Sequence, residues 1–234
     1  AQEIAVLKGI AAHYVMRADA DNVLVIDRSG SMGSPASKIA DAKDAAELYV
    51  DSWREGDMVG VVSFECDATP PELTLRDWTE TSRDDAHTEI NGIAAGGGTS
   101  IGNGLQVGPD ELVASGDSSH TSALILLSDG NNTCEADIAD FLATYEGRVD
   151  GGDQVPQVHT VAIGADANRP DLENLAATTG GTYHFAAEPP AGPKGVPGTD
   201  FFRDMAEIYR TISERVSRQQ QVLNQRGESQ RITP

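Results

Sequence analysis

Cysteine is scarce in this chain, and its spacing argues against two common kinds of cysteine site. The 234 residues contain two cysteines, Cys66 and Cys134, and neither forms a C-x-x-C pair or has a histidine beside it. A zinc site or a thioredoxin-type redox pair is therefore disfavoured. Each cysteine follows an expected strand, so both should lie near the same rim of a sheet. A disulfide is open to them there, but we expect two free thiols.

Long apolar runs are also missing. No stretch approaches the roughly 18 apolar residues that a membrane-spanning helix needs. The first residues also lack the charged, apolar and small-residue order of a signal peptide. We therefore expect no direct membrane contact. The sequence can be a mature form or an excised piece, so secretion stays open.

Positive charge is the third shortage. The chain has 17 Lys and Arg against 37 Asp and Glu, which gives a formal net charge of -20. A field of this sign repels nucleic acid and anionic lipid, so we expect no nucleic-acid partner. The acidic residues are spread along the chain, which indicates a solvated acidic surface rather than an acidic tail. The oligomeric state is not indicated.

Strand-like apolar runs alternate with segments of helical periodicity, which predicts an α/β fold. A hydrophobic content of 39% over 234 residues suits one domain with a substantial core. Alternation of this kind indicates a mostly parallel sheet covered by helices on both faces. The expected strands cover residues 23–26, 58–64, 73–75, 123–128, 158–163 and 182–185. The expected helices cover 37–53, 82–93, a segment from 100 broken at Gly108 and Pro109, 135–145, 168–179 with Asn168 as cap, and a segment from 200.

The most informative stretch runs from Val23 to Met32. Four apolar residues read as a buried strand, and the run stops at a carboxylate followed by two hydroxyls, Asp27, Ser29 and Ser31. Open α/β sheets bind ligands at the carboxyl ends of their strands. Hard oxygen donors there suit Mg²⁺, Mn²⁺ or Ca²⁺ better than zinc or copper. Taken alone, the pattern is also typical of a turn that satisfies its own backbone.

Two further stretches strengthen the metal interpretation. A glycine-rich turn, Gly96 to Gly98, leads to Thr99. A second buried run, residues 123–128, ends at Asp129 in an S-D-G setting. Because these segments could meet at one sheet edge, three hydroxyls and two carboxylates could surround one ion. Each residue singly could instead cap a helix or brace a loop.

This constellation resembles the metal-ion-dependent adhesion site of the von Willebrand factor type A family. The positions of the D-x-S-x-S motif, the lone threonine and the second aspartate are all filled, by Asp27, Ser29, Ser31, Thr99 and Asp129. The resemblance covers residues 21–217 and implies a doubly wound, Rossmann-like sheet with one short antiparallel edge strand. Residues 1–20 would be an N-terminal extension with helical spacing of its apolar positions, and 218–234 a polar tail.

The resemblance also implies a function. Members of the family use the site as a protein-binding module rather than as an enzyme, so we expect a divalent cation, Mg²⁺ or Mn²⁺ before Ca²⁺. Its open coordination position should accept a Glu or Asp carboxylate from a partner protein.

Enzymatic readings find little support in the sequence. The nucleophile-elbow, dinucleotide-binding and P-loop patterns all fail. The alternative is a Mg²⁺-dependent hydrolase or phosphotransferase with Asp27 as nucleophile. Such enzymes need a lysine beside the phosphate, and none of the four lysines follows a strand end. A third interpretation, a rigid spacer domain, predicts no metal affinity.

Within the family, two stretches resemble prokaryotic surface proteins and calcium-activated chloride channel regulators more than integrin I domains. These are residues 55–64 and 160–164. An extracellular or cell-surface setting is implied, with a cytoplasmic one as the alternative. The helix from residue 200 stands where integrin I domains have their switch helix. Its expected buried stripe comprises Phe202, Met205, Tyr209, Ile212 and Val216.

Overall fold

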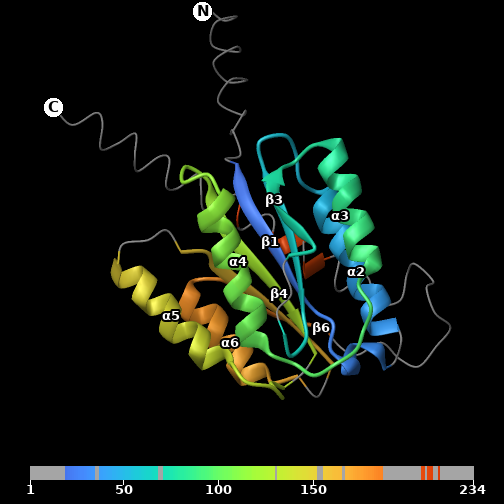
Figure 1. Cartoon of the computed structure of the whole chain (residues 1–234), viewed down its shortest axis with the longest axis vertical. Coiled ribbons are helices and arrows are strands. Elements are labelled where there is room, and N and C mark those ends of the chain that lie inside the picture. Colours follow the sequence, from blue (N-terminus) through green and yellow to red (C-terminus); the bar gives the residue numbers. More distant parts are fainter. Residues whose placement is uncertain are drawn as a thin grey trace, which may run out of the picture.

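A six-stranded sheet forms the centre of the molecule (Figure 1). The computed structural model describes residues 19–34, 37–67, 71–129, 131–151, 155–164, 167–186, 207–208, 210–212 and 216. The strands are β1 (Ala20–Asp27), β2 (Met58–Phe64), β3 (Leu73–Asp77), β4 (Thr121–Ser128), β5 (Gln157–Ile163) and β6 (Tyr183–Ala186). Their order is β3-β2-β1-β4-β5-β6, and only the β2–β3 pairing is antiparallel. The predicted fold class is confirmed.

Helices cover both faces of this sheet (Figure 1). The covering elements are α2 (Ser37–Asp51), α3 (Glu80–Gly92), α4 (Ile101–Ser115), α5 (Ile138–Gly151) and α6 (Arg169–Thr179). A short 3-10 turn, η1 (Gly30–Gly33), precedes α2. The helices α2 and α3 pack on one face, and α4, α5 and α6 pack on the other. This is the doubly wound arrangement that the alternation of strands and helices predicts.

Alternation along the central strand divides the core into two layers. Leu24 and Ile26 of β1 belong to the cluster that includes α2 and α3, whereas Val23 and Val25 belong to the cluster on the other face. Because side chains alternate across a strand, one fully buried strand supplies both layers. All eight residues of β1 are buried, and this fixes where its last residue, Asp27, must lie.

The break expected at Gly108 and Pro109 is wrong, because α4 runs through both residues to Ser115. Proline removes one helical N–H donor, which normally weakens a helix interior. Here the flanking Leu105 and Leu112 are buried against the sheet, and Gly108 lies against Leu124. Burial of this apolar face compensates for the lost hydrogen bond.

Two further expectations about helix starts also need correction. The helix expected from residue 135 begins at Ile138, because Ala136 has a φ of 54° and the Asp137 carboxylate accepts hydrogen bonds from the N–H groups of Ala139 and Asp140. Asn168 does occupy the N-cap position of α6. Its side chain, however, makes no capping bond and donates to Asp171 Oδ2 at 2.5 Å instead.

Part of the C-terminal stripe can be checked. Ile208, Ile212 and Val216 are helical and buried in the cluster that includes α2 and α3. This confirms Ile212 and Val216, whereas Phe202, Met205 and Tyr209 lie outside the described residues, as do the first 18 residues of the predicted extension 1–20 and the whole tail 218–234. Among the residues that are described, no helix has the length and apolar character to cross a bilayer.

Candidate metal site

The site begins where two neighbouring strands end. β1 and β4 run parallel, with Ile26 opposite Leu127, so the residues that follow them reach the same edge of the sheet. β1 ends at Asp27, and Asp129 follows directly on the end of β4. The register therefore brings two carboxylates together although they are far apart in the sequence.

Asp27 is fully buried and both of its oxygens accept hydrogen bonds. Ser128 Oγ donates to Oδ2 at 2.6 Å, and the Ser29 N–H donates to Oδ1 at 2.8 Å. Burial raises the pKa of Asp27 to about 6, and the nearby charge of Asp129 adds to the rise, while the bonds from Ser128 and Ser29 oppose it. The ionised form of Asp27 is therefore costly in the metal-free protein, and a cation beside it would relieve that cost.

A chain of polar contacts links the two serines of the motif to Asp129. Ser31 Oγ donates to Asp129 Oδ1 at 2.7 Å, and Ser29 Oγ lies 3.0 Å from Ser31 Oγ. Because Ser31 gives its proton to the carboxylate, Ser29 must be the donor in the second contact. Ser29 and Asp129 are buried, whereas Ser31 is exposed to solvent.

Lys38, which lies in the first turn of α2, supplies a positive charge to this cluster. Its Nζ donates to Asp129 Oδ2 at 2.8 Å, and both side chains are almost fully buried. Lys38 was not among the predicted site residues. Its place in the site could have been predicted from its position soon after the D-x-S-x-S motif, in a chain with only four lysines.

Thr99 lies in a loop that is hydrogen-bonded to the β1 loop. The Gly96 N–H donates to the Arg28 carbonyl at 2.7 Å, and the Gly30 N–H donates to the Gly97 carbonyl at 3.0 Å. Thr99 itself is buried. The structure thus connects Ser29, Ser31 and Asp129 side chain to side chain, joins Asp27 to them through the Ser29 N–H, and sets the Thr99 loop alongside.

The turn before Thr99 requires glycine at two positions. Gly97 has a φ of 77°, and a Cβ there would overlap the Glu65 carboxylate. A Cβ on Gly98 would lie 2.6 Å from Cys66 Sγ and 2.8 Å from Cys134 Sγ. The glycine run therefore permits the close approach of Glu65 on one side and of both sulfurs on the other.

Those sulfurs form a disulfide, so the expectation of two free thiols is wrong. Cys66 and Cys134 are bonded, with their Cα atoms 5.4 Å apart and a separation of 68 positions in the sequence. The expectation that both cysteines lie at one rim is confirmed. What the sequence could not show is that the loops after β2 and β4 converge over Gly98, which brings the two side chains within bonding distance.

The Thr99 loop is also held through its backbone. The Thr99 N–H donates to Thr133 Oγ1, and the Thr99 carbonyl accepts from the N–H groups of Thr133 and Cys134. On the other side, the Ser100 N–H donates to the Glu65 carbonyl and the Asn103 amide donates to the Cys66 carbonyl. The disulfide thus joins the two segments that hold the Thr99 loop.

The donor set fits a hard cation. Within the described ranges, no group of three or more His, Cys, Asp or Glu side chains is placed to hold a metal ion. A metal at this edge would therefore depend on serine and threonine hydroxyls together with two carboxylates, all of them oxygen donors. Oxygen-only ligands suit Mg²⁺, Mn²⁺ and Ca²⁺.

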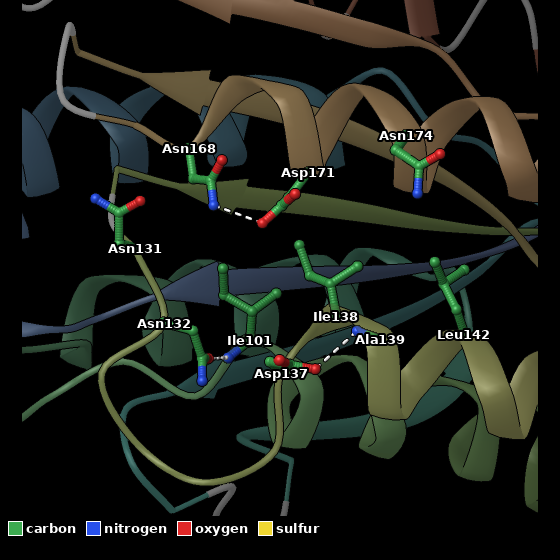
Figure 2. Close-up of a pocket in the computed structure, with 10 residues that line it drawn as sticks. All are labelled: Ile101, Asn131, Asn132, Asp137, Ile138, Ala139, Leu142, Asn168, Asp171 and Asn174. Atoms are coloured by element: carbon green, nitrogen blue, oxygen red, sulfur yellow. Dashed lines mark hydrogen bonds between the residues drawn. The ribbon is translucent and has the colours of Figure 1, made fainter.

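A polar pocket of about 320 Å³ lies at the same edge of the sheet, between α5 and α6 (Figure 2). Asn168, Asp171 and Asn174 line it from the α6 side, opposite Ile138 and Leu142 of α5. The loop after β4 contributes to it with Asn131 and Asn132, two and three residues after Asp129. This pocket was not predicted from the sequence, because it depends on the packing of two helices.

Comparison with known proteins connects the chain to one type of domain. A family profile described as von Willebrand factor type A domain matches residues 22–131. The calcium-activated chloride channel regulator 3A-1 of Mus musculus is 33% identical over 164 residues, which cover 70% of this chain. The chain spans only 17% of the length of that regulator.

Solved structures share the fold. A von Willebrand factor type A protein from Catenulispora acidiphila matches with a TM-score of 0.71 at 22% identity, over 86% of this chain and 43% of the other. Proximal thread matrix protein 1 from the mussel byssus, in a structure with a zinc-occupied adhesion motif, matches with a TM-score of 0.64 at 19% identity. That match covers 87% of this chain and 46% of the other.

Proposed function

Because the chain contains a von Willebrand factor type A domain, we propose that it is a metal-dependent protein-binding module. The proposed ligands of a divalent cation are Asp27, Ser29, Ser31, Thr99 and Asp129. The observation that carries the proposal is the continuous set of contacts from Asp27 to Asp129 at the carboxyl edge of the sheet. Mg²⁺ or Mn²⁺ is the preferred ion, ahead of Ca²⁺.

The residues of the cluster have distinct roles in this proposal. Asp27 is the negatively charged ligand at the buried end of the site, and hydrogen bonds from Ser128 and from the Ser29 N–H orient it. The hydroxyls of Ser29, Ser31 and Thr99 are neutral donors, so they add no charge to that of the two aspartates. A bound divalent cation would supply an electrophilic position for the Glu or Asp carboxylate of a partner protein. We further propose that the pocket between α5 and α6, which Asn131 and Asn132 line shortly after Asp129, binds groups of the partner beside that carboxylate.

The disulfide supports an extracellular or cell-surface location. Structural disulfides persist in oxidising compartments and are rare in reducing cytosol. Cys66 and Cys134 are bonded beside the proposed site, so its loops depend on oxidising conditions. The zinc held by the mussel protein makes Zn²⁺ a further ion to test, although the oxygen donors of this chain favour Mg²⁺ or Mn²⁺.

The structure supplies the lysine that a phosphotransferase mechanism needs, because Lys38 lies in the cluster, but the burial of Asp27 disfavours that residue as the nucleophile. Asp27 has no exposed surface, and each of its oxygens accepts a hydrogen bond. Attack on phosphorus needs an oxygen that a whole phosphate group can approach, and Asp27 has no accessible surface for a group of that size, whereas a single cation is much smaller. The binding module is therefore the function that the site supports best.

Calorimetric titration of Mg²⁺ and Mn²⁺ into the chelator-stripped chain tests the proposal. We expect saturable binding of one ion, weakened about 100-fold, or roughly 2.7 kcal/mol, in Asp27→Ala and Thr99→Ala. Thr88→Ala is the matched control, because Thr88 is an exposed threonine on α3 that bonds only to the Asp84 carbonyl in its own helix. Wild-type protein that folds but binds no ion, or unchanged binding in both site variants, would refute the proposal.

A second experiment tests recognition of the partner's carboxylate once metal binding is established. Immobilised peptides with a single Glu or Asp, compared with their Gln or Asn counterparts, should be retained in Mn²⁺ and released by chelator. Retention of the amide peptides to the same extent would show that the carboxylate is not what the site recognises.

A further inference from the structure

The Lys38–Asp129 ion pair lies inside the proposed metal site. Lys38 Nζ is 2.8 Å from Asp129 Oδ2, and the two side chains are 9% and 0% exposed. Both oxygens of Asp129 are engaged, one by the Lys38 ammonium and the other by the Ser31 hydroxyl. The Lys38 ammonium is therefore bound to Asp129, which is one of the two carboxylates that a divalent ion would need.

We propose that Lys38 is a built-in counter-cation that competes with the divalent ion for Asp129 and so determines how tightly the site holds metal. This inference rests on the proposed function and adds a residue outside the set of proposed ligands. The ammonium stabilises the metal-free protein, because it neutralises a carboxylate that would otherwise be buried without a counter-charge.

Charge counting supports the competition. Asp27 and Asp129 contribute two negative charges, and Lys38 cancels one of them. An ammonium and a divalent ion on the same carboxylate repel each other strongly at this depth, where water screens them weakly. Metal therefore binds to Asp129 only when the Lys38 contact is given up or lengthened.

The chain offers the displaced ammonium another carboxylate. Asp41 is three residues after Lys38 on α2, a spacing at which helical side chains are neighbours. It is buried, and burial together with the negative charge of Asp44 raises its pKa. A positive charge arriving beside Asp41 would be stabilised. In this proposal, a bound metal ion displaces the Lys38 ammonium from Asp129 towards Asp41.

Four variants of the full chain test the inference. Lys38→Met removes the charge and keeps most of the apolar stem, and Lys38→Gln removes the charge but keeps an N–H donor for Asp129. Lys38→Arg keeps the charge. Lys43→Met is the matched control, because Lys43 is also on α2 but donates to the backbone carbonyls of Asn91 and Ile93.

Mn²⁺ affinity is measured by calorimetry on chelator-stripped protein. We expect Lys38→Met and Lys38→Gln to bind Mn²⁺ at least about tenfold more tightly than the wild type, with Lys38→Arg and Lys43→Met close to the wild type. Two neutral variants keep the test decisive if one of them folds poorly. Equal or weaker binding by the neutral variants overturns the role of Lys38 and leaves the metal site intact. No Mn²⁺ binding by any of the proteins overturns both proposals.

Melting temperature provides a second readout. Without metal, Lys38→Met should melt below the wild type, because Asp129 keeps only the Ser31 hydrogen bond and loses its counter-charge. Saturating Mn²⁺ should then raise its melting temperature more than that of the wild type, since tighter binding to the folded state stabilises it more. A smaller rise than in the wild type would overturn the inference.

Discussion

The two ends of strand β1 use buried aspartates in different ways. At the amino end, Asp21 accepts a hydrogen bond from the Asp117 N–H at 2.7 Å and contacts His120 Nδ1 at 2.7 Å. Near the same edge, Asp57 accepts from the N–H groups of Ala20 and Arg54. These carboxylates hold loops by satisfying backbone donors that would otherwise be buried without partners.

At the carboxyl end, the aspartates contact mainly side chains. Ser128 donates to Asp27, and Ser31 and Lys38 donate to Asp129. A hydroxyl can turn and offer a lone pair to a cation, and a lysine side chain can move, whereas a backbone N–H can only donate. The loops at this end are held instead by a disulfide and by backbone bonds. Carboxylates are therefore available to a ligand at the end of the strand where other groups hold the loops.

Removing the disulfide should have the largest effect on this comparison. We expect the double variant Cys66→Ser and Cys134→Ser to lose about 4 kcal/mol of unfolding free energy, because the bond closes a loop of 68 residues in the unfolded chain. Mn²⁺ affinity should also fall, since the segments that hold the Thr99 loop are no longer joined. Urea unfolding and calorimetry measure the two quantities.

Reduction of the native disulfide is the control for this experiment. Reduction of the wild type by a dithiol, with its excess removed, should reproduce the double variant. Unchanged Mn²⁺ affinity in the reduced protein would show that backbone bonds alone position the loop, and that the carboxyl end does not need its covalent constraint.

The pH dependence of the unfolding free energy distinguishes the aspartates at the two ends of β1. The folded-state pKa of Asp27 is about 6 against an ordinary value of 3.8, so between these values the folded state holds a proton that the unfolded state has released. The unfolding free energy of metal-free protein should therefore fall as pH rises from about 4 to about 6. The contribution of Asp27 is about 3 kcal/mol by the usual conversion of pKa units.

The variant Asp27→Asn isolates this contribution. In chelator, its unfolding free energy should decrease less than that of the wild type over the same pH range. Asp21→Asn serves as the comparison at the other end, because burial also raises the pKa of Asp21 while the contact with His120 opposes the rise. A wild-type curve that rises from pH 4 to 6 with the same slope as Asp27→Asn would show that Asp27 is not the source.

The strand ends of the fold could be predicted because each carries a local signal. The apolar residues of β1 stop at a carboxylate, and the run of β4 stops at Ser128 and Asp129, so position in the sequence already indicates position at the sheet edge. The continuity of α4 through Pro109 was not predictable in this way. It depends on the burial of Leu105 and Leu112 against strands that are distant in the sequence.

The missed features of the site are all contacts between separate elements. Lys38 reaches Asp129 over 91 residues, and Cys66 reaches Cys134 over 68. Neither pairing follows from local propensity, because the sequence shows which loops share an edge but not which side chains meet there. The pocket between α5 and α6 is likewise set by how two helices pack.

Truncating Asp21 should give the smallest of these effects and the clearest separation between the two ends. Asp21→Ala leaves the Asp117 N–H and His120 without their buried acceptor, so we expect a loss of about 2 kcal/mol of unfolding free energy. Asp21→Asn keeps an oxygen for the Asp117 N–H and should lose less. Mn²⁺ affinity should be unchanged in both variants, because Asp21 lies at the end of β1 opposite Asp27. If Asp21→Ala weakened Mn²⁺ binding as much as Asp27→Ala does, the two ends would be one coupled unit.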